Sequence, residues 1–208
     1  MRRTAIVLAG GVSKRFGQDK ALVQIAGKPL ISRVYERARE AVEEVIVVAS
    51  SDGQRESYTS LLPSETRFAV DVEGSRGPLV GALTGLMNAR GEYSILLPSD
   101  TPFVSVHVMK LLFDISQGLD AVIPRWPNGY IEPLQAVYRT NAALTASRVA
   151  TTKGETRLQS MISMLRRVRY VSTIAIRGID PHLVTFFNIN APTDLKRAEQ
   201  LIEKKMDM

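Results

Sequence analysis

The sequence predicts an α/β protein whose central sheet is mostly parallel and is covered by helices on both faces. Two observations lead to this fold class. Short apolar runs rich in β-branched residues alternate with segments of helical spacing over the first 124 residues. After residue 124 this rhythm changes, and a small irregular β addition is expected in the second half. Alternating strands and helices are typical of a sheet that is buried on both faces, which gives a protein of three layers.

The elements of the first half follow from these patterns. Strands are expected at residues 4–9, 45–49, 67–70, 93–98 and 120–124. The apolar positions of residues 30–41 fall on one stripe, and Pro29 stands where a first-turn proline belongs. Residues 78–89 are apolar nearly all round, as in a buried helix, and residues 106–115 predict a further helix.

The second half begins with a Pro-Asn-Gly turn between two strand-like arms. This pattern predicts an irregular hairpin or an addition at the edge of the sheet. Helices are then expected at 141–150, 156–165 and 192–204, and strands at 170–176 and 184–188. No linker, repeat or low-complexity stretch divides the chain, so residues 1–208 are expected to form a single domain.

The composition excludes several kinds of site. The 208 residues include no cysteine, which removes disulfides, thiolate metal sites and cysteine nucleophiles and favours a reducing, cytoplasmic setting. The apolar run behind Arg2 and Arg3 is too short for a membrane span, so we expect no membrane association. The net charge of +6 suits polyanionic ligands. Because the basic residues are scattered along the chain and aromatic residues make up only 6%, small phosphorylated molecules are favoured over nucleic acid.

A glycine loop follows the first expected strand. Gly10 and Gly11 allow a backbone with positive φ that brings N–H groups close to an anion, and Lys14, Arg15 and Lys20 supply mobile charge. The spacing matches neither a Walker A loop nor Gly-x-Gly-x-x-Gly. The alternative is a tight turn with solvated charges, but two glycines followed by three bases favour phosphate binding.

Asp100 ends the apolar run LLPSD and stands between Pro98 and Pro102. Its carboxylate should project from the carboxyl edge of the sheet, where ligands of open α/β sheets bind. A carboxylate beside a phosphate loop is a natural magnesium ligand. The alternative is a cap for the helix that follows Pro102.

Six motifs follow one another in the order of a known family. They read LAGGVSKRFGQDKAL, GKPLI, RGPLVGAL, LLPSDTPF, EPLQAVY and FNINAPTDL. In this order they closely resemble the molybdenum cofactor guanylyltransferases, the MobA-like branch of the nucleotidyltransferases. The resemblance spans nearly the whole chain and implies a three-layer, Rossmann-like nucleotidyltransferase fold. It also implies an enzyme that transfers GMP from GTP to the phosphate of the molybdopterin cofactor and releases pyrophosphate.

The resemblance assigns a nucleotide site position by position. Lys20, in the DKAL element, is expected on the phosphates with Arg15 assisting, and both stand with Asp100 as catalytic candidates. An aspartate before GPL contacts the nucleotide in the family, and Asp71 matches it, while the spacing leaves Glu73 open. The loop residues expected to touch the purine nucleotide and its phosphates are Leu8, Ala9, Gly10 and Gly11.

The same resemblance implies a metal and an acceptor site. The family's aspartate after the LLP strand holds magnesium, which makes Asp100 the metal ligand and Mg²⁺ the cofactor. Asn188 and Asn190 match an element on the pterin side, with a cap for the helix at 192 as the alternative for Asn190. The nucleotide candidates all precede residue 101, which leaves the later elements EPLQAVY, KGETRL and NIN to bind the acceptor. Arg157, after KGET, would then offer bidentate donors to the acceptor phosphate, or is a solvated helix charge. Residues 1–104 would thus bind the nucleotide and 105–208 the acceptor.

The expected partners are GTP, the molybdopterin cofactor and molybdoenzyme-maturation proteins, while the oligomeric state stays open. Where the family often has a base-contacting asparagine, this chain has only Ser50, Ser51 and Asp52, so CTP stays an alternative. Other open acceptors are a sugar phosphate, phospholactate and cobinamide phosphate, and a non-catalytic nucleotide-binding protein is the alternative to an enzyme. Trp126 and Tyr130 are candidates either for stacking on a flat pterin or for packing.

Overall fold

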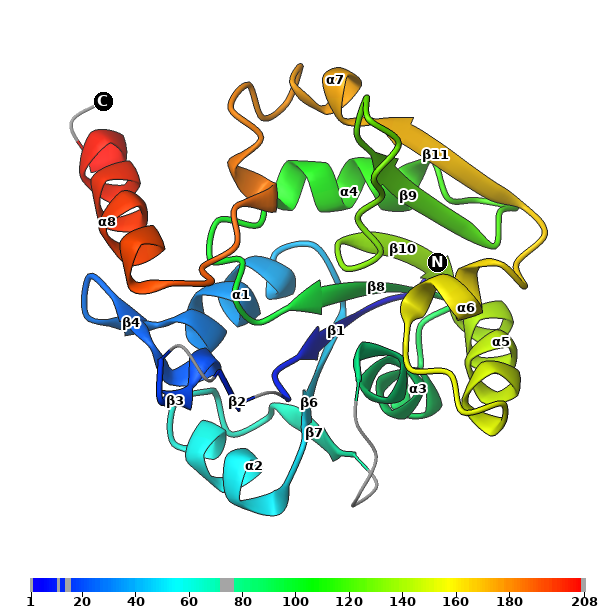
Figure 1. Cartoon of the computed structure of the whole chain (residues 1–208), viewed down its shortest axis with the longest axis horizontal. Coiled ribbons are helices and arrows are strands. Elements are labelled where there is room, and N and C mark those ends of the chain that lie inside the picture. Colours follow the sequence, from blue (N-terminus) through cyan, green and yellow to red (C-terminus); the bar gives the residue numbers. More distant parts are fainter. Residues whose placement is uncertain (1, 11, 14–15, 72–76, 207–208) are drawn as a thin grey trace.

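The computed structural model describes residues 2–10, 12–13, 16–71 and 77–206 (Figure 1). The strands are β1 (Arg3–Leu8), β2 (Val12–Ser13), β3 (Gln18–Asp19), β4 (Gln24–Ile25), β5 (Lys28–Pro29), β6 (Glu44–Ala49), β7 (Arg67–Val70), β8 (Tyr93–Pro98), β9 (Ala121–Arg125), β10 (Ala136–Arg139) and β11 (Val168–Ser172). The helices are α1 (Leu30–Arg39), α2 (Asp52–Thr59), α3 (Pro78–Asn88), α4 (Val106–Asp114), α5 (Thr140–Thr152), α6 (Leu158–Ile162), α7 (Thr173–Ile176) and α8 (Pro192–Met206). Two 3₁₀ helices span Lys20–Leu22 and Val184–Phe186.

One large sheet forms the centre of the molecule, with the strand order β11-β9-β10-β8-β1-β6-β7. Its neighbouring strands pair in parallel, except that β10 is antiparallel to both β8 and β9. In register, Leu8 at the end of β1 lies between Val48 of β6 and Pro98 of β8. The loops that follow these three strands therefore meet at one edge of the sheet, which we call the carboxyl edge. The prediction of a mostly parallel sheet is confirmed.

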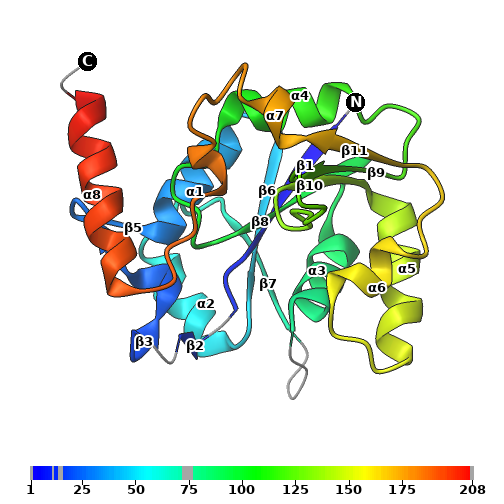
Figure 2. The ribbon, with the colours of Figure 1, turned by 45° about the horizontal axis from the view of Figure 1, so that its top comes forward.

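Helices cover both faces of this sheet (Figure 2). Helices α1, α2 and α4 pack on one face, against side chains that include Val7 and Val47. Helices α3, α5 and α6 pack on the other, against side chains that include Ile6 and Val48. Because successive side chains of a strand point to opposite faces, apolar neighbours such as Ile6 and Val7 serve both layers. Strand β6 is consequently buried along its whole length.

A smaller apolar cluster joins the last helix to the beginning of the chain. Val23, Ile25 and Leu30 pack with Ile189 and with Ala198 of α8. Figure 1 shows α8 beside the β4 region, far from α5 and α6. Strands β4 and β5 form a short hairpin, and packing against it brings the C-terminal segment close to the loop that follows β1. Within the described ranges, none of the helices is both long and apolar enough to cross a membrane.

The second half departs from the sequence expectations in three places. The expected hairpin is present, but β10 is inserted between β8 and β9, so it is not an edge addition; the edge strands are β11 and β7. The strand expected at 170–176 ends at Ser172, because the Ser172 hydroxyl accepts a hydrogen bond from the Ile174 N–H (3.2 Å) and starts α7. The strand expected at 184–188 is wrong, since this segment contains a 3₁₀ helix.

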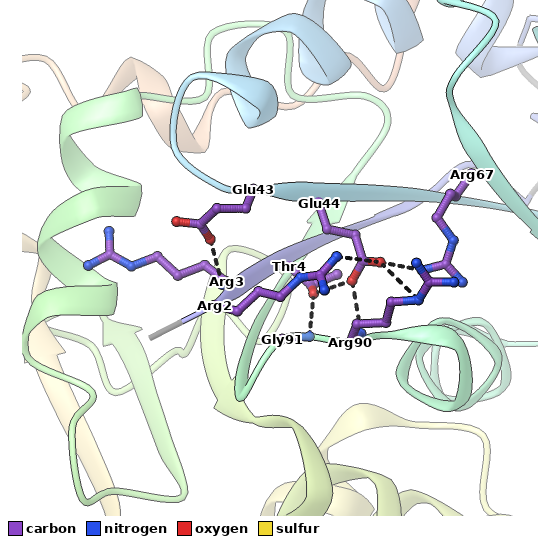
Figure 3. Close-up of polar contacts among 8 residues, drawn as sticks. All are labelled: Arg2, Arg3, Thr4, Glu43, Glu44, Arg67, Arg90 and Gly91. Atoms are coloured by element: carbon purple, nitrogen blue, oxygen red, sulfur yellow. Dashed lines mark hydrogen bonds and ion pairs between the residues drawn. The ribbon is translucent and has the colours of Figure 1, made fainter.

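The opposite, amino edge of the sheet is closed by an ion cluster around Glu44 (Figure 3). The Glu44 Oε2 atom accepts hydrogen bonds from Thr4 Oγ1 (2.7 Å) and Arg90 N (2.8 Å), and Oε1 pairs with Arg67. Thr4 Oγ1 in turn accepts a hydrogen bond from Gly91 N (2.9 Å). Burial alone would raise the pKa of the Glu44 carboxyl, but these donors outweigh it and lower that pKa below its ordinary value.

Candidate active site

The glycine loop emerges from the carboxyl edge between the neighbours of β1. Ala9 N donates to Val48 O (2.9 Å) and Ser99 N donates to Leu8 O (3.1 Å), so the end of β1 is held on both sides. A Cβ atom on Gly10 would lie 3.0 Å from Ser50 Cβ, which explains why this position needs the smallest residue. Gly11 and Arg15, with Lys14, lie outside the described residues.

Lys20 is fixed in place by its neighbour Asp19. Asp19 precedes the 3₁₀ helix Lys20–Leu22, and its Oδ1 accepts a hydrogen bond from Ala21 N (3.0 Å). Its Oδ2 lies 2.5 Å from the hydroxyl of the fully buried Tyr58, which also lies 2.9 Å from Ala9 O. Burial and then Asp19 raise the pKa of the Tyr58 hydroxyl, so it stays protonated and acts as a donor. One side chain of α2 thus ties the glycine loop to the segment that carries Lys20.

The Lys20 ammonium joins two residues that are distant in the sequence. Lys20 Nζ lies 2.5 Å from Asp100 Oδ2 and 2.7 Å from Asn190 Oδ1. The side chains of Lys20 and Asp100 are 17% and 21% exposed, so this cluster remains open to solvent. Ile189 N donates to Asp100 O (3.0 Å), which links the two loops through their backbones as well. Predicted residues from both halves of the chain therefore meet at the carboxyl edge.

Asp100 is not a helix cap. Ser105 precedes α4 and its Oγ accepts the hydrogen bond from Val108 N (3.3 Å), so the cap interpretation of Asp100 is wrong. Of the two Asp100 oxygens, Oδ2 is paired with Lys20, while Oδ1 makes no hydrogen bond to the residues that the structure describes. An open carboxylate oxygen suits a cation that is otherwise coordinated by phosphate oxygens and water, once the ammonium has turned to the phosphates.

The donor set at this edge fits magnesium better than a metal held by protein ligands alone. In the described part of the chain there is no group of three or more histidine, aspartate or glutamate side chains that could hold a metal ion. Magnesium commonly uses one or two carboxylates together with substrate phosphates, and it keeps several waters. Asp100 supplies one such carboxylate.

Asp71 lies at the end of β7, on the α3 side of the glycine loop. Its backbone N donates to Ala49 O (2.9 Å), and a Cβ on Gly81 of α3 would lie 3.6 Å from its Oδ2. Its Oδ1 is buried and has no hydrogen-bond partner among the residues described. Burial raises the pKa of the Asp71 carboxyl, and the Thr84 hydroxyl opposes this shift. A ligand that donates hydrogen bonds would relieve this cost. Glu73, the alternative, lies outside the described residues.

The acceptor candidates occupy two separate places. Asn188 and Asn190 are exposed on either side of the buried Ile189, next to Asp100. The cap interpretation of Asn190 is wrong, because Asp194 Oδ2 accepts the Asn190 N–H (2.9 Å) at the start of α8, and the Asn190 amide oxygen faces Lys20. Arg157 is exposed and precedes α6, which lies across the molecule from α8 (Figures 1 and 2). The structure does not bring it beside the two asparagines.

Two other expectations concern aromatic residues. The Trp126 indole N–H donates to Glu132 Oε1 (2.7 Å), and the ring packs edge-on against Phe186 with centroids 5.7 Å apart. These contacts agree with the packing interpretation of Trp126. Tyr130 is 61% exposed at the tip of the hairpin.

Sequence reasoning missed Asp19 and Tyr58. A signal for Asp19 was present, because an aspartate directly before the Lys-Ala-Leu turn has the residue type of a helix cap. Tyr58 gave none, since α2 is otherwise polar and its one buried aromatic is recognisable only from its partners in the fold.

Comparisons with known proteins show the family of the chain. The family model of the MobA-like NTP transferase domain matches residues 5–169. A protein of Methanosarcina acetivorans named "Probable molybdenum cofactor guanylyltransferase" is 38% identical over 93% of this chain and 88% of its own length. The molybdenum cofactor guanylyltransferase of Desulfosudis oleivorans is 34% identical over 96% of each chain.

A solved structure gives the same result. The crystal structure of the molybdopterin-guanine dinucleotide biosynthesis protein A from Archaeoglobus fulgidus superposes with a TM-score of 0.83. It shares 32% sequence identity and covers 97% of this chain and 99% of its own. The match of a family model over most of the chain, together with these relatives, shows that the chain belongs to the MobA-like NTP transferase family.

Proposed function

We propose that the protein is a nucleotidyltransferase that moves GMP from GTP onto the terminal phosphate of the molybdopterin (molybdenum) cofactor and releases pyrophosphate. The observation that carries this proposal is the meeting of Lys20, Asp100 and Asn190 beside the glycine loop. The relatives named as molybdenum cofactor guanylyltransferases, which align over nearly the whole chain, support the choice of substrates.

The reaction needs no nucleophilic side chain. A phosphate oxygen of the acceptor attacks the α-phosphorus of GTP, a new P–O bond forms, and the bond between the α-phosphorus and the bridging oxygen to the β-phosphate breaks. The leaving group is pyrophosphate, which carries away the electron pair of that bond. Because the acceptor phosphate is already ionised, no strong base is required. The protein must instead align two polyanions and offset their repulsion.

The residues at the carboxyl edge are suited to this task. Lys20, held by Asp19, would leave its partners Asp100 and Asn190 and contact the phosphates of GTP, as a point charge that follows the developing negative charge. Backbone N–H groups of the loop after Leu8 would bind the same phosphates. The half-buried Asp71 carboxylate would accept hydrogen bonds from the nucleotide through its buried Oδ1.

We propose Mg²⁺ as the cofactor and Asp100 as its protein ligand. When bound, this ion would neutralise phosphate charge and orient the triphosphate. Asn188 and Asn190 would donate and accept hydrogen bonds at the edge of the pterin, because both residues are exposed and Asn190 lies beside Lys20. A reducing compartment such as the cytoplasm suits a chain without cysteine.

The test is a transfer assay. The protein is incubated with Mg²⁺, molybdenum cofactor and each of the four nucleoside triphosphates, and pyrophosphate is measured. We expect pyrophosphate release that needs the cofactor and GTP. Release with CTP in place of GTP, or with a sugar phosphate in place of the cofactor, would identify a related transferase; release with none would contradict the proposal.

A further inference from the structure

A buried polar cluster lies beneath the Asp100 loop, between Gln135 and Thr185. Gln135 Nε2 donates to Thr185 O (2.7 Å), and Thr185 Oγ1 donates to Gln135 Oε1 (3.1 Å). Thr185 Oγ1 also accepts a hydrogen bond from Ser105 N (3.0 Å), and Thr185 N donates to Asp180 Oδ2 (2.8 Å). Gln135 is 4% exposed and Thr185 is fully buried. The cluster is therefore hydrogen-bonded on both side chains and buried, which makes its geometry stiff.

Gln135 occupies this place at a conformational cost. Its φ of 90° lies in the left-handed region, which non-glycine residues rarely adopt. Its backbone N donates to Leu96 O (2.7 Å) of β8, the strand that leads into Asp100. Strained residues of this kind persist where the surrounding contacts hold them, and they gather at functional sites. Here the contacts that hold the strain are the two amide hydrogen bonds to Thr185.

The cluster connects the loop that carries Asp100 with the segment that carries the acceptor candidates Asn188 and Asn190. Ser105 ends the loop that begins at Asp100, and its backbone is bound to the Thr185 hydroxyl. Thr185 is in the 3₁₀ helix that leads to Asn188 and Asn190. The second link between these loops is the hydrogen bond from Ile189 N to Asp100 O. If the first link is lost, the bond from Ile189 N and the side-chain contacts of Lys20 must hold the asparagines against Asp100.

We propose that Gln135 and Thr185 are positioning residues of the transfer reaction, which hold the Asn188–Asn190 segment in register with Asp100 and Lys20. This inference rests on the proposed function. It assigns the EPLQAVY motif a buried supporting role through Gln135 in place of direct contact with the acceptor. The nucleotide side has its own anchor in Asp19 and Tyr58, so the cluster should govern the acceptor more than GTP.

The test compares Thr185→Val, which has the same shape but no hydroxyl, with Thr185→Ser, which keeps the hydroxyl. Both are measured well below their melting temperatures, together with Gln135→Met, so that a folding failure of one variant leaves a second. For Thr185→Val and Gln135→Met we expect kcat/KM for the acceptor to fall about ten- to a hundredfold, as for small misplacements of reacting groups. The Kd for GTP should change less than about twofold, and Thr185→Ser should restore most of the activity.

Hydrogen exchange provides a readout that does not depend on turnover. The amides of Ile189 and Asn190 should exchange faster in Thr185→Val than in Thr185→Ser. Wild-type acceptor kinetics and wild-type exchange in folded Thr185→Val, or equal losses of GTP and acceptor binding, would overturn the inference. If the wild-type protein transfers no GMP, the proposed function fails, while the exchange comparison still decides whether the cluster holds this segment.

Discussion

The two edges of the sheet each carry a carboxylate among cations, but the two carboxylates are bonded differently. At the amino edge, Glu44 is 4% exposed and receives hydrogen bonds on both oxygens, with Arg2 and Arg90 also within 4.0 Å. At the carboxyl edge, Asp100 is 21% exposed, and only its Oδ2 is paired, with Lys20. A carboxylate paired with cations therefore closes the amino edge, whereas a similar pairing at the carboxyl edge leaves an oxygen able to bind a ligand.

This difference separates a stabilising ion cluster from a functional one. A buried carboxylate whose acceptor sites are filled gains nothing from a further cation, so Glu44 serves to join β1, β6, β7 and the loop before β8. A partly exposed carboxylate with an open oxygen can exchange its partner for a metal or let its lysine turn to a phosphate. The position of each cluster agrees, because ligands of parallel sheets bind at the carboxyl ends of the strands.

The sharpest way to break the comparison is to neutralise each carboxylate in turn. Asp100→Asn keeps the shape but weakens a hard-ion ligand, and we expect turnover to fall by about two to four orders of magnitude. Steady-state rates at limiting and saturating Mg²⁺ measure this. The control is Glu44→Gln, which should keep wild-type turnover at 25 °C. Near-normal turnover of Asp100→Asn at limiting Mg²⁺ would show that Asp100 holds no metal.

The next largest effect is expected for Lys20→Ala. Removing the ammonium takes away a charge that contacts both Asp100 and Asn190, and we expect kcat/KM for GTP to fall about 10²-fold or more. Isothermal titration with GTP and Mg²⁺ should show weaker binding. The matched control is Lys28→Ala, a lysine on β5 that pairs with Glu36. Equal effects of the two substitutions would leave Lys20 without a special role.

Much of the fold followed from the sequence because its signals are local. The strands at 67–70 and 93–98 and the helix beginning at Leu30 are apolar runs whose period is set by the strand or helix itself. The strand predicted at 184–188 was wrong because tertiary contacts set the backbone of this segment. Thr185, for example, is bound to Gln135 and Asp180. Apolar character predicted burial there but could not predict backbone shape.

The site followed from the sequence only in part. Lys20 and Asp100 were assigned from motifs, and the structure places them in contact, although their roles remain predictions. Arg157 and Asn190 were grouped because both follow residue 104, yet the fold puts Arg157 before α6, on the face covered by α3 and α5, and Asn190 against Lys20 at the carboxyl edge. Order along the chain says nothing about which loops meet at an edge, since that depends on the insertion of β10 and the docking of α8 on the β4–β5 hairpin.

At the amino edge, the expected effect is on stability and on its dependence on pH. Glu44→Gln should lower the free energy of unfolding by about 1–3 kcal/mol at pH 7, the usual cost of leaving buried partners unsatisfied. The pKa of Glu44 is lowered in the folded state, so its contribution is present above the ordinary value of 4.5 and is lost as the pH falls through the folded-state pKa. Urea unfolding of both proteins between pH 7 and pH 3 should therefore show a difference that shrinks with acid. A difference that grows with acid would mean that the cluster does not favour the ionised form.

The smallest expected effect distinguishes two of the acceptor candidates, Asn190 and Arg157. Asn190→Ala removes an exposed amide that contacts Lys20, and we expect KM for the acceptor to rise about tenfold with little change in the Kd for GTP, as for the loss of one or two hydrogen bonds. Arg157→Ala, on the α6 side, should change the acceptor KM less than about threefold, because an exposed side chain with no ion pair to the residues that the structure describes contributes little. Initial rates at varied cofactor concentration and at varied GTP concentration separate the effect on the acceptor from the effect on GTP. The melting temperature of each variant controls for damage to the fold. A larger acceptor defect in Arg157→Ala than in Asn190→Ala would reverse the assignment and move the acceptor phosphate to the side of the sheet covered by α3 and α6.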